Sequence, residues 1–193
     1  EEFQIYFQPK VVPETGQISS VEVLVRWLRD GKIYLSPAAY IPLFEQNGFV
    51  IDLDYYVYEK TFQWLQKASH SLPESFRISL NVSPVHFEQP QIFVDKIQAL
   101  IDKYKINPTY LTFEITESAY VNRPDAVNQV IHSLQRQNIQ ISMDDFGSGY
   151  SSLNTLKDLQ FDEVKIDRKF LGDSLSDNAR IVLQEIFHML KRL

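Results

Sequence analysis

Apolar and polar residues alternate at the start of the chain, and farther along apolar residues recur at helical spacing. Residues 4–12 and 18–27 alternate on either side of the turn-forming residues 13–16, which predicts two strands joined as a hairpin. Four later groups recur every three or four residues and predict helices: Val57, Thr61, Trp64, Leu65 and Ala68; Phe93, Ile97, Leu100, Ile101 and Tyr104; Val127, Val130, Ile131 and Leu134; and Val182, Ile186, Met189, Leu190 and Leu193. Short β-rich segments at 76–82, 110–116, 139–144 and 161–167 lie between them.

The predicted strands each carry a polar face as well as an apolar one. Repeated β–α units predict a largely parallel sheet, either open with helices on both faces or closed as a barrel. In 110–116, for example, Thr112 and Glu114 share one face and Phe113 and Ile115 share the other. An open sheet covered on both faces leaves no place for the polar side chains, whereas a barrel turns them into its lumen. The pattern therefore favours a barrel, with its active site at the carboxyl ends of the strands.

The composition of the chain excludes several kinds of functional site and partner. The chain has 193 residues, 44% hydrophobic and 23% charged, enough for one large domain or two small ones. It has no cysteine, which excludes disulfides and thiolate zinc sites, and its four histidines lack the H-E-x-x-H spacing. The net charge of -6 argues against nucleic acid as a partner. Because no apolar run is long enough to span a bilayer and residues 1–12 do not resemble a signal peptide, we expect a cytoplasmic domain without membrane contact, in a full-length protein that could be membrane-anchored elsewhere.

Oxygen-bearing side chains occur near the ends of four predicted strands: Glu22, Asn81, Glu114 and Asp144. Each one alone has an ordinary explanation as a solvated strand residue, a turn residue or a helix cap. Together at one barrel mouth they would be costly without counter-charge, and oxygen-only donors select a hard cation such as Mg²⁺ or Mn²⁺. The adjacent Asp145 offers a carboxylate to a second ion, and a two-metal centre suits attack on a phosphodiester.

Two basic residues complete this candidate site. Lys165 lies on the polar face of 161–167 and is expected to reach the same mouth, where it orients or helps to activate the attacking water. Arg26 shares a face with Glu22 and is placed to clamp a phosphate.

Seven segments, in order, resemble the EAL domain family, the cyclic-di-GMP phosphodiesterases of bacterial signalling. They are Y-F-Q-P-K at 6–10, E-V-L-V-R-W at 22–27, S-P-A-A-Y-I-P-L-F-E at 36–45, L-N-V-S-P at 80–84, F-E-I-T-E-S at 113–118, D-D-F-G-S-G-Y-S-S-L at 144–153 and V-K-I-D-R at 164–168. Val23 stands where the family usually has alanine. The resemblance implies an α/β fold, a TIM-like (β/α)₈ barrel with an antiparallel first strand, and hydrolysis of cyclic-di-GMP to linear pGpG.

The resemblance also implies roles for individual residues. The ligands of two Mg²⁺ or Mn²⁺ ions would be Glu22, Asn81, Glu114, Asp144 and Asp145, with Asp144 bridging both ions. Lys165 would hold the hydrolytic water and would form the catalytic set with Glu22 and Asp144. The nucleotide site would be lined by Gln8, Leu24, Arg26 and Asp167. Glu117 would steady the loop after Asp145 from behind the ligands.

The length departs from the family pattern, because a barrel of this class needs about 250 residues. With about six strands and roughly thirty residues per β–α unit, we expect 1–193 to be an EAL domain lacking its last two units. Those units carry a further glutamate and a glutamine–glycine segment in the family, so this portion alone is expected to be nearly inactive. Two alternatives stay open: a non-catalytic cyclic-di-GMP receptor, and an unrelated metal-dependent barrel hydrolase. The resemblance also allows for a homodimer, and for a sensory or diguanylate cyclase domain in the full-length protein.

Overall fold

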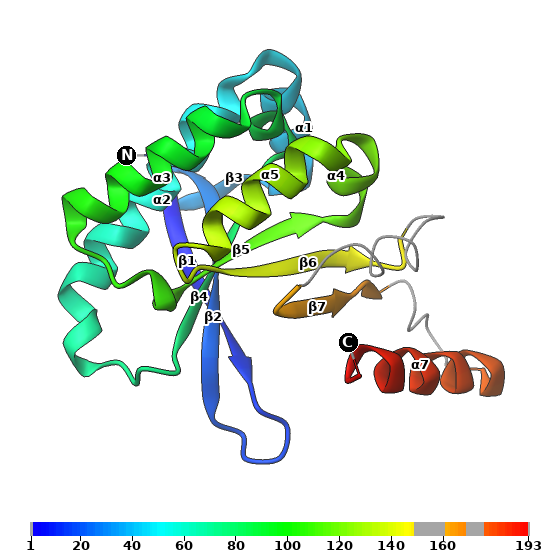
Figure 1. Ribbon diagram of the computed structural model, residues 1–193. Coiled ribbons are helices and arrows are strands. Elements are labelled where there is room, and N and C mark those ends of the chain that lie inside the picture. The colour runs from blue at the N-terminus through cyan, green and yellow to red at the C-terminus, as the bar shows by residue number, and fades with distance from the viewer. Residues whose placement is uncertain (1, 149–160, 169–175, 193) are drawn as a thin grey trace.

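One curved sheet organises the chain in the computed structural model, which describes residues 2–148, 161–168 and 176–192 (Figure 1). The strand order is β1-β2-β4-β5-β6-β7, with β3 paired to β2 off this path. The strands are β1 Phe3–Val11, β2 Ile18–Arg29, β3 Lys32–Leu35, β4 Arg77–Asn81, β5 Leu111–Thr116, β6 Gln140–Phe146 and β7 Glu163–Ile166. β1 and β3 run antiparallel to β2, and all pairings from β2 to β7 along the main path are parallel. This confirms the barrel-type sheet with an antiparallel first strand.

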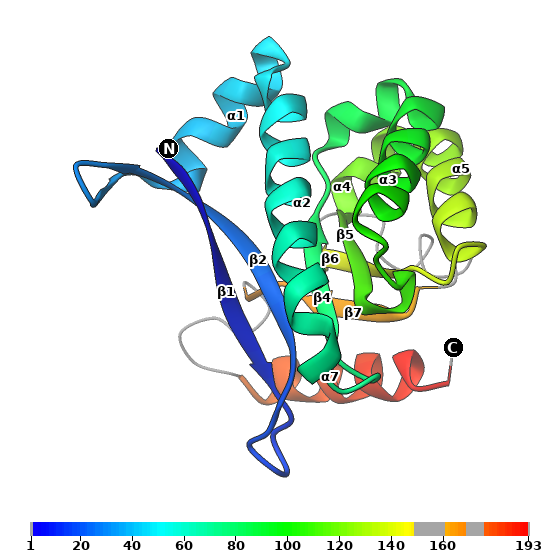
Figure 2. The ribbon, with the colours of Figure 1, turned by 90° about the vertical axis from the view of Figure 1, so that its left-hand side faces the viewer.

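The helices lie on the apolar, outer face of this sheet (Figures 1 and 2). They are α1 Pro37–Asn47, α2 Phe49–Ala68, α3 Pro90–Tyr104, α4 Glu117–Asn122, α5 Pro124–Gln135 and α7 Asp177–Leu190, with short 3₁₀ turns η1 Ser69–Ser71, η2 Pro84–Glu88 and η3 Pro108–Tyr110. Proline opens α1, α3 and α5, where its missing N–H leaves no helical hydrogen bond unmade. Gly48, with a φ of 79°, ends α1 and lets the chain turn directly into α2.

The core lies between the outer face of the sheet and these helices, in two parts. The larger part joins β2, β4 and β5 to α2, α3 and α5, and it contains Leu80, Phe113 and Phe62. A smaller part forms where α7 packs on the outer face of β6 through contacts with Met143 and Phe146. α7 covers the same face of the strands as α2, α3 and α5, as the outer helices of a barrel do.

The inner face of the sheet is polar and mostly buried. Ser79, Thr112, Glu114 and Ser142 are each at most 3% exposed, and they come from the neighbouring strands β4, β5 and β6. The alternation in the sequence predicted this lumen. β1 and β7 are the two ends of the described strand order, and a side-chain contact spans them: Lys10 Nζ lies 3.0 Å from Glu163 Oε2.

The observed elements differ from the predicted ones mainly where burial gives no periodic signal. β3 is exposed along its whole length, so no alternation between apolar and polar positions marks it. It is formed through the tight turn at Asp30 and Gly31, which both have positive φ. α4 has only six residues, too few to show a helical repeat. The last predicted helix ends in the structure at Leu190, and Leu193 lies outside the described residues.

Phe113 tests whether the outer-face core carries the stability. Its ring is fully buried, with centroids 5.5 Å from Tyr58 and 5.8 Å from Phe93. Phe113→Ala is expected to lower the free energy of unfolding by about 3–5 kcal/mol, through lost burial and the cavity left behind. Ile92→Ala, at a side chain 50% exposed, should cost less than about 1 kcal/mol. Urea unfolding of both variants measures the difference, and equal losses would contradict this account of the core.

Candidate active site at the strand ends

Strand register brings the predicted oxygen donors to one end of the sheet. Glu22 lies beside Ser79 on β4, Asn81 lies beside Glu114, and Thr116 lies beside Asp144. Since the strands are parallel and side chains alternate, the donors on the polar face meet near the carboxyl ends. Asn81 Nδ2 donates a hydrogen bond of 3.1 Å to Glu22 Oε1, which joins β4 to β2 at this mouth.

Lys165 lies at the centre of this cluster. Its ammonium nitrogen lies 2.8 Å from Glu114 Oε2, 3.2 Å from Glu22 Oε2 and 3.2 Å from Asp144 Oδ2. Burial by itself lowers the pKa of Lys165, but the carboxylates of Glu114, Asp144 and Glu22 outweigh burial and raise that pKa above 10.5. The mouth therefore holds a charged ammonium among three carboxylates.

Glu114 is the most deeply buried member, with 1% of the residue exposed. Burial acts to raise its pKa, yet the nearby ammonium groups of Lys165 and Lys10 bring that pKa below 4.5. Its two oxygens have separate partners, because Oε2 accepts from Lys165 and Oε1 accepts from Lys10 at 2.9 Å. Glu114 is thus an ionised carboxylate held from both sides.

The adjacent aspartates lie at an irregularity in β6. The register of β6 with β7 shifts between Met143 and Phe146, and Asp145 adopts a left-handed φ of 55°. Asp144 Oδ1 accepts a hydrogen bond of 2.9 Å from the Asp145 N–H, and this bond supports the turn. The normal alternation is therefore interrupted here: Asp144 reaches Lys165 while Asp145 is exposed beside it.

Glu117 lies behind this turn, on the first residue of α4. Thr116 caps that helix by accepting from the Ala119 N–H, so β5 passes straight into α4 and Glu117 is buried. Its Oε2 accepts a hydrogen bond of 3.0 Å from the Gly147 N–H, two residues after Asp145. This contact agrees with the role expected for Glu117, which stays a prediction. Residues 149–153 of the same motif lie outside the described residues.

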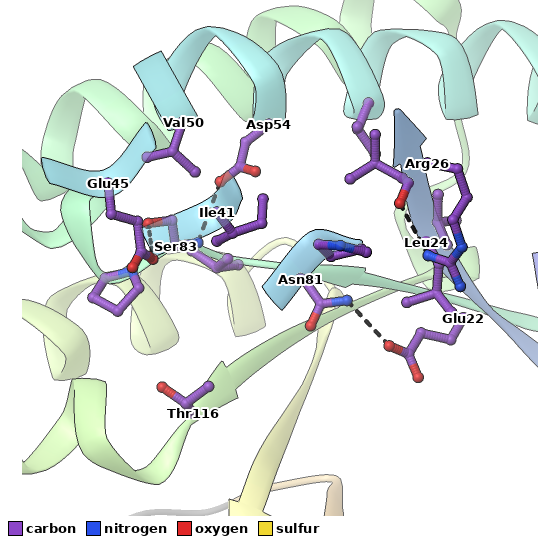
Figure 3. A pocket seen from close by; sticks show the side chains of 16 residues that line it. Glu22, Leu24, Arg26, Ile41, Glu45, Val50, Asp54, Asn81, Ser83 and Thr116 are labelled. Atoms are coloured by element: carbon purple, nitrogen blue, oxygen red, sulfur yellow. Dashed lines mark hydrogen bonds between the residues drawn. The ribbon is translucent and has the colours of Figure 1, made fainter. Parts of the chain in front are cut away.

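A pocket of about 320 Å³ opens beside the cluster, between the end of β2 and helices α1 and α2 (Figure 3). Glu22 and Asn81 line the side of the pocket near the carboxylates, and Leu24 and Arg26 continue its wall along β2. The Arg26 guanidinium donates to the backbone oxygen of Val25 at 2.9 Å. The structure thus brings Leu24 and Arg26 together with two of the predicted metal ligands.

The other two predicted nucleotide residues lie elsewhere at this end of the sheet. Gln8 on β1 is exposed and lies directly opposite Glu22 in the strand register. Asp167 follows β7, and its backbone N–H donates to the Phe146 oxygen at 3.0 Å. Neither residue lines the 320 Å³ pocket found in the described part of the chain.

The sequence analysis did not identify three further residues that line this pocket: Glu45, Asp54 and Ser83. Asp54 Oδ2 lies 3.2 Å from the Ser83 N–H and 3.0 Å from His86 Nε2, while Ser83 Oγ donates to Glu45 Oε1 at 2.8 Å. Burial raises the pKa of Asp54 despite these contacts. A signal was present, because Asp54 precedes the buried Val57 by three residues and therefore shares the apolar face of α2.

Lys10 was also missed, although its position held a signal. It stands two residues after Gln8, on the same face of β1 as a residue already assigned to the site. Its ammonium points into the lumen and contacts Ser79, Glu114 and Glu163.

The oxygen donors at the strand ends are of the chemical type that binds a hard cation. Glu22, Glu114 and Asp144 direct carboxylate oxygens toward one point, and the Asn81 amide lies beside them. In the described residues, no three acidic or histidine side chains are placed so as to hold a metal ion as they stand. The Lys165 ammonium is at the point where the three carboxylates meet. A cation that took these oxygens would therefore replace contacts that Lys165 makes.

The fold and the site define the class: a β/α barrel protein whose strand ends gather acidic oxygen donors around a lysine. The chain belongs to the EAL domain family, whose model matches residues 1–193. This agrees with the resemblance seen in the sequence motifs.

Two similar proteins carry names that state an activity. The probable cyclic di-GMP phosphodiesterase PdeG of Escherichia coli is 35% identical over 167 residues, or 86% of this chain. The cyclic di-GMP phosphodiesterase PA2567 of Pseudomonas aeruginosa is 31% identical over 195 residues, or 100% of this chain. The chain spans 33% of the length of each of them.

Two solved structures support the fold. PaMucR phosphodiesterase in complex with c-di-GMP has a TM-score of 0.86 and 28% identity, covering 96% of this chain and 75% of that one. The EAL enzyme Bd1971, bound to cAMP and cyclic-di-GMP, has a TM-score of 0.88 and 26% identity, covering 99% of this chain and 53% of that one. As for the membrane, none of the helices in the described ranges combines the length and apolarity needed to cross a bilayer.

Lys165 provides a test of the charge balance at the mouth. Lys165→Met is expected to lower the free energy of unfolding by about 2–4 kcal/mol, because three partly buried carboxylates lose their shared cation. Adding Mg²⁺ should recover part of this loss. Thermal unfolding with and without Mg²⁺ measures both effects.

Lys103→Met is the matched control, since the Lys103 side chain is 58% exposed and pairs with Glu59 at the surface. It should leave thermal stability nearly unchanged and should not respond to Mg²⁺. A Lys165→Met variant as stable as the wild type without Mg²⁺ would contradict the central role of Lys165.

Proposed function

We propose that this chain is a cyclic-di-GMP phosphodiesterase domain that hydrolyses cyclic-di-GMP to linear pGpG. The observation that carries the proposal is the convergence of Glu22, Glu114 and Asp144 on Lys165 at the strand ends of an EAL domain. Similar proteins named as cyclic di-GMP phosphodiesterases, and the c-di-GMP complex of PaMucR, support the same substrate.

Two divalent cations, Mg²⁺ or Mn²⁺, belong to this proposal. The residues that would hold the first ion are Glu22, Asn81, Glu114 and Asp144; those for the second are Asp144 and Asp145. When bound, such ions would polarise the phosphate and lower the pKa of a coordinated water. The oxygen-only donor set and the acidity of the mouth support this choice of cation.

The chain's own side chains would bind and orient the substrate. Lys165 would hold the water that attacks the phosphorus, since its ammonium already lies among the carboxylates at the mouth. Arg26 would contact a phosphate oxygen from the wall of the pocket. Leu24 would pack against the nucleotide, and Gln8 and Asp167 would contact it from β1 and from the end of β7. Glu117 would keep the turn around Asp145 in place through its bond to Gly147.

A multidomain arrangement is a further part of the proposal. MucR of Pseudomonas aeruginosa, named as a bifunctional diguanylate cyclase/cyclic di-GMP phosphodiesterase, is 31% identical over 180 residues, which cover 92% of this chain and 26% of MucR. We therefore propose that this domain acts beside a sensory or diguanylate cyclase domain in its full-length protein. Homodimerisation also stays a proposal.

Glu22→Gln and Asp144→Asn test the metal ligands. Each is expected to lower kcat for pGpG release in the full-length protein by about a thousandfold, because a cation contributes several kcal/mol to catalysis. Chromatography of the nucleotide products in Mg²⁺ or Mn²⁺ measures the rate. Glu14→Gln, at the exposed hairpin turn, is the control and should leave the rate unchanged.

Two results would decide against these assignments. An unaffected rate in Glu22→Gln or Asp144→Asn would refute the role of that residue as a ligand. Binding of cyclic-di-GMP by the wild type without any hydrolysis would instead identify a receptor.

Arg26→Ala separates phosphate binding from chemistry. The loss of a charge-assisted hydrogen bond is expected to raise KM for cyclic-di-GMP by about 10–100-fold, with a smaller change in kcat. Arg29→Ala is the matched control, because Arg29 is exposed and lies over the Tyr34 ring, 5.3 Å from its centroid. Steady-state kinetics measure both variants, and equal KM values for the two would contradict the assignment of Arg26.

A further inference from the structure

Lys10 connects β1 to three other strands across the barrel lumen. From β1, its ammonium lies 2.9 Å from Ser79 Oγ on β4, 2.9 Å from Glu114 Oε1 on β5 and 3.0 Å from Glu163 Oε2 on β7. An ammonium group has three hydrogens to donate, so these contacts account for all of them. Only 22% of the Lys10 side chain is exposed. Its position is therefore fixed by partners on three separate strands.

Glu114 accepts a hydrogen bond from Lys10 on one carboxylate oxygen and from Lys165 on the other. Oε1 is turned toward Lys10 in the lumen, and Oε2 is turned toward Lys165 at the mouth, 2.8 Å from its ammonium. A carboxylate held at both oxygens cannot rotate freely about its last torsion. Consequently, Oε2 is the oxygen that Glu114 presents to the candidate cation site.

The two lysines differ in what else they contact. Lys165 also contacts Glu22 and Asp144, so its contacts are the ones that a bound cation would replace. Apart from Glu114, the Lys10 ammonium contacts only Ser79 and Glu163 among the described residues, and neither of these belongs to the proposed ligand set. The Lys10 contact can therefore persist when the mouth changes its occupant.

We infer that Lys10 is a positioning residue, which holds Glu114 from the lumen so that Oε2 faces the cation site. The inference rests on the proposed function, since it assigns Glu114 to a cation. Partners that orient metal ligands in this way typically contribute 10–100-fold to metal affinity.

Two other roles for Lys10 predict different results. If its charge acted only through space, removing it would strengthen cation binding, because an ammonium repels a cation. If it only joined β1 to β7 through Glu163, its loss would lower stability without changing cation affinity. The sign and size of the affinity change therefore distinguish the three roles.

The experiment is a titration of the full-length protein with Mn²⁺ alone, with free Mn²⁺ followed by electron paramagnetic resonance. Lys10→Met is expected to weaken Mn²⁺ binding by about 10-fold or more. Lys10→Gln keeps a hydrogen-bond donor, so its Mn²⁺ affinity should fall less. Lys10→Arg keeps both the charge and the donors, so its Mn²⁺ affinity should stay close to that of the wild type. If Lys10→Met fails to fold, the direction of the change in Mn²⁺ affinity in Lys10→Gln distinguishes the roles. A positioning role predicts weaker binding, and an effect of charge alone predicts tighter binding.

Glu163→Gln is the matched control for the strand-joining role. It weakens the contact between β1 and β7 but keeps Lys10 beside Glu114, so Mn²⁺ affinity should change by less than about threefold. Thermal unfolding of every variant reports the structural contribution separately. Unchanged or tighter Mn²⁺ binding in Lys10→Met and Lys10→Gln, or an equal loss in Glu163→Gln, overturns the inference.

Failure of the proposed function gives a different result. A wild-type protein that binds Mn²⁺ but releases no pGpG would refute the phosphodiesterase proposal and leave the role of Lys10 standing. Hydrolysis by a wild type whose Lys10→Met and Lys10→Gln variants bind Mn²⁺ as tightly as it does would refute the role of Lys10 alone. A wild type that takes up no Mn²⁺ would refute the role of Lys10, and if it also releases no pGpG with Mg²⁺ or Mn²⁺ it would refute the proposed function as well.

Discussion

The contact of Lys165 with Glu22, Glu114 and Asp144 is the constraint on which the candidate site depends. Three carboxylates at one end of a sheet repel one another, and Glu114 is almost completely removed from water. The ammonium of Lys165 makes that arrangement tolerable, since it lies within 3.2 Å of all three. A cation at the same place would satisfy the same need, so the electrostatic requirement of the folded state and that of the proposed catalysis would be met at one point.

The sheet supplies the geometry that makes this contact possible. Parallel pairing from β2 to β7 places polar side chains of successive strands on one face of the sheet, while the apolar side chains of the same strands pack against the outer helices. A shift of one residue in β5 would move Glu114 into the core and Phe113 into the lumen. Burial of Phe113 against Tyr58 and Phe93 therefore fixes the register that brings Glu114 to the mouth.

The sequence allowed prediction of the parts of the site that follow from alternation. Glu114 and Lys165 stand on polar faces of strands whose apolar faces are plain from the residue types, so their convergence was predictable. Asp54 was missed, because its place on the apolar face of α2 marks it only as a buried residue, and the packing of α2 beside the strand ends is what brings it to Ser83. Lys10 was overlooked because its partners come from three other strands, and the pattern of β1 alone does not name them.

The adjacent aspartates show where strand periodicity stops being a guide. In a regular strand Asp144 and Asp145 would point to opposite faces, and Asp145 would enter the apolar side. The left-handed conformation of Asp145 and the register shift before Phe146 remove that conflict, since Asp145 is exposed and Phe146 returns to the core. Aspartate tolerates this conformation better than most residues, and the Asp144 carboxylate supports it by accepting the Asp145 N–H. The second carboxylate therefore depends on the first for its position, which ties any second cation site to the one around Asp144.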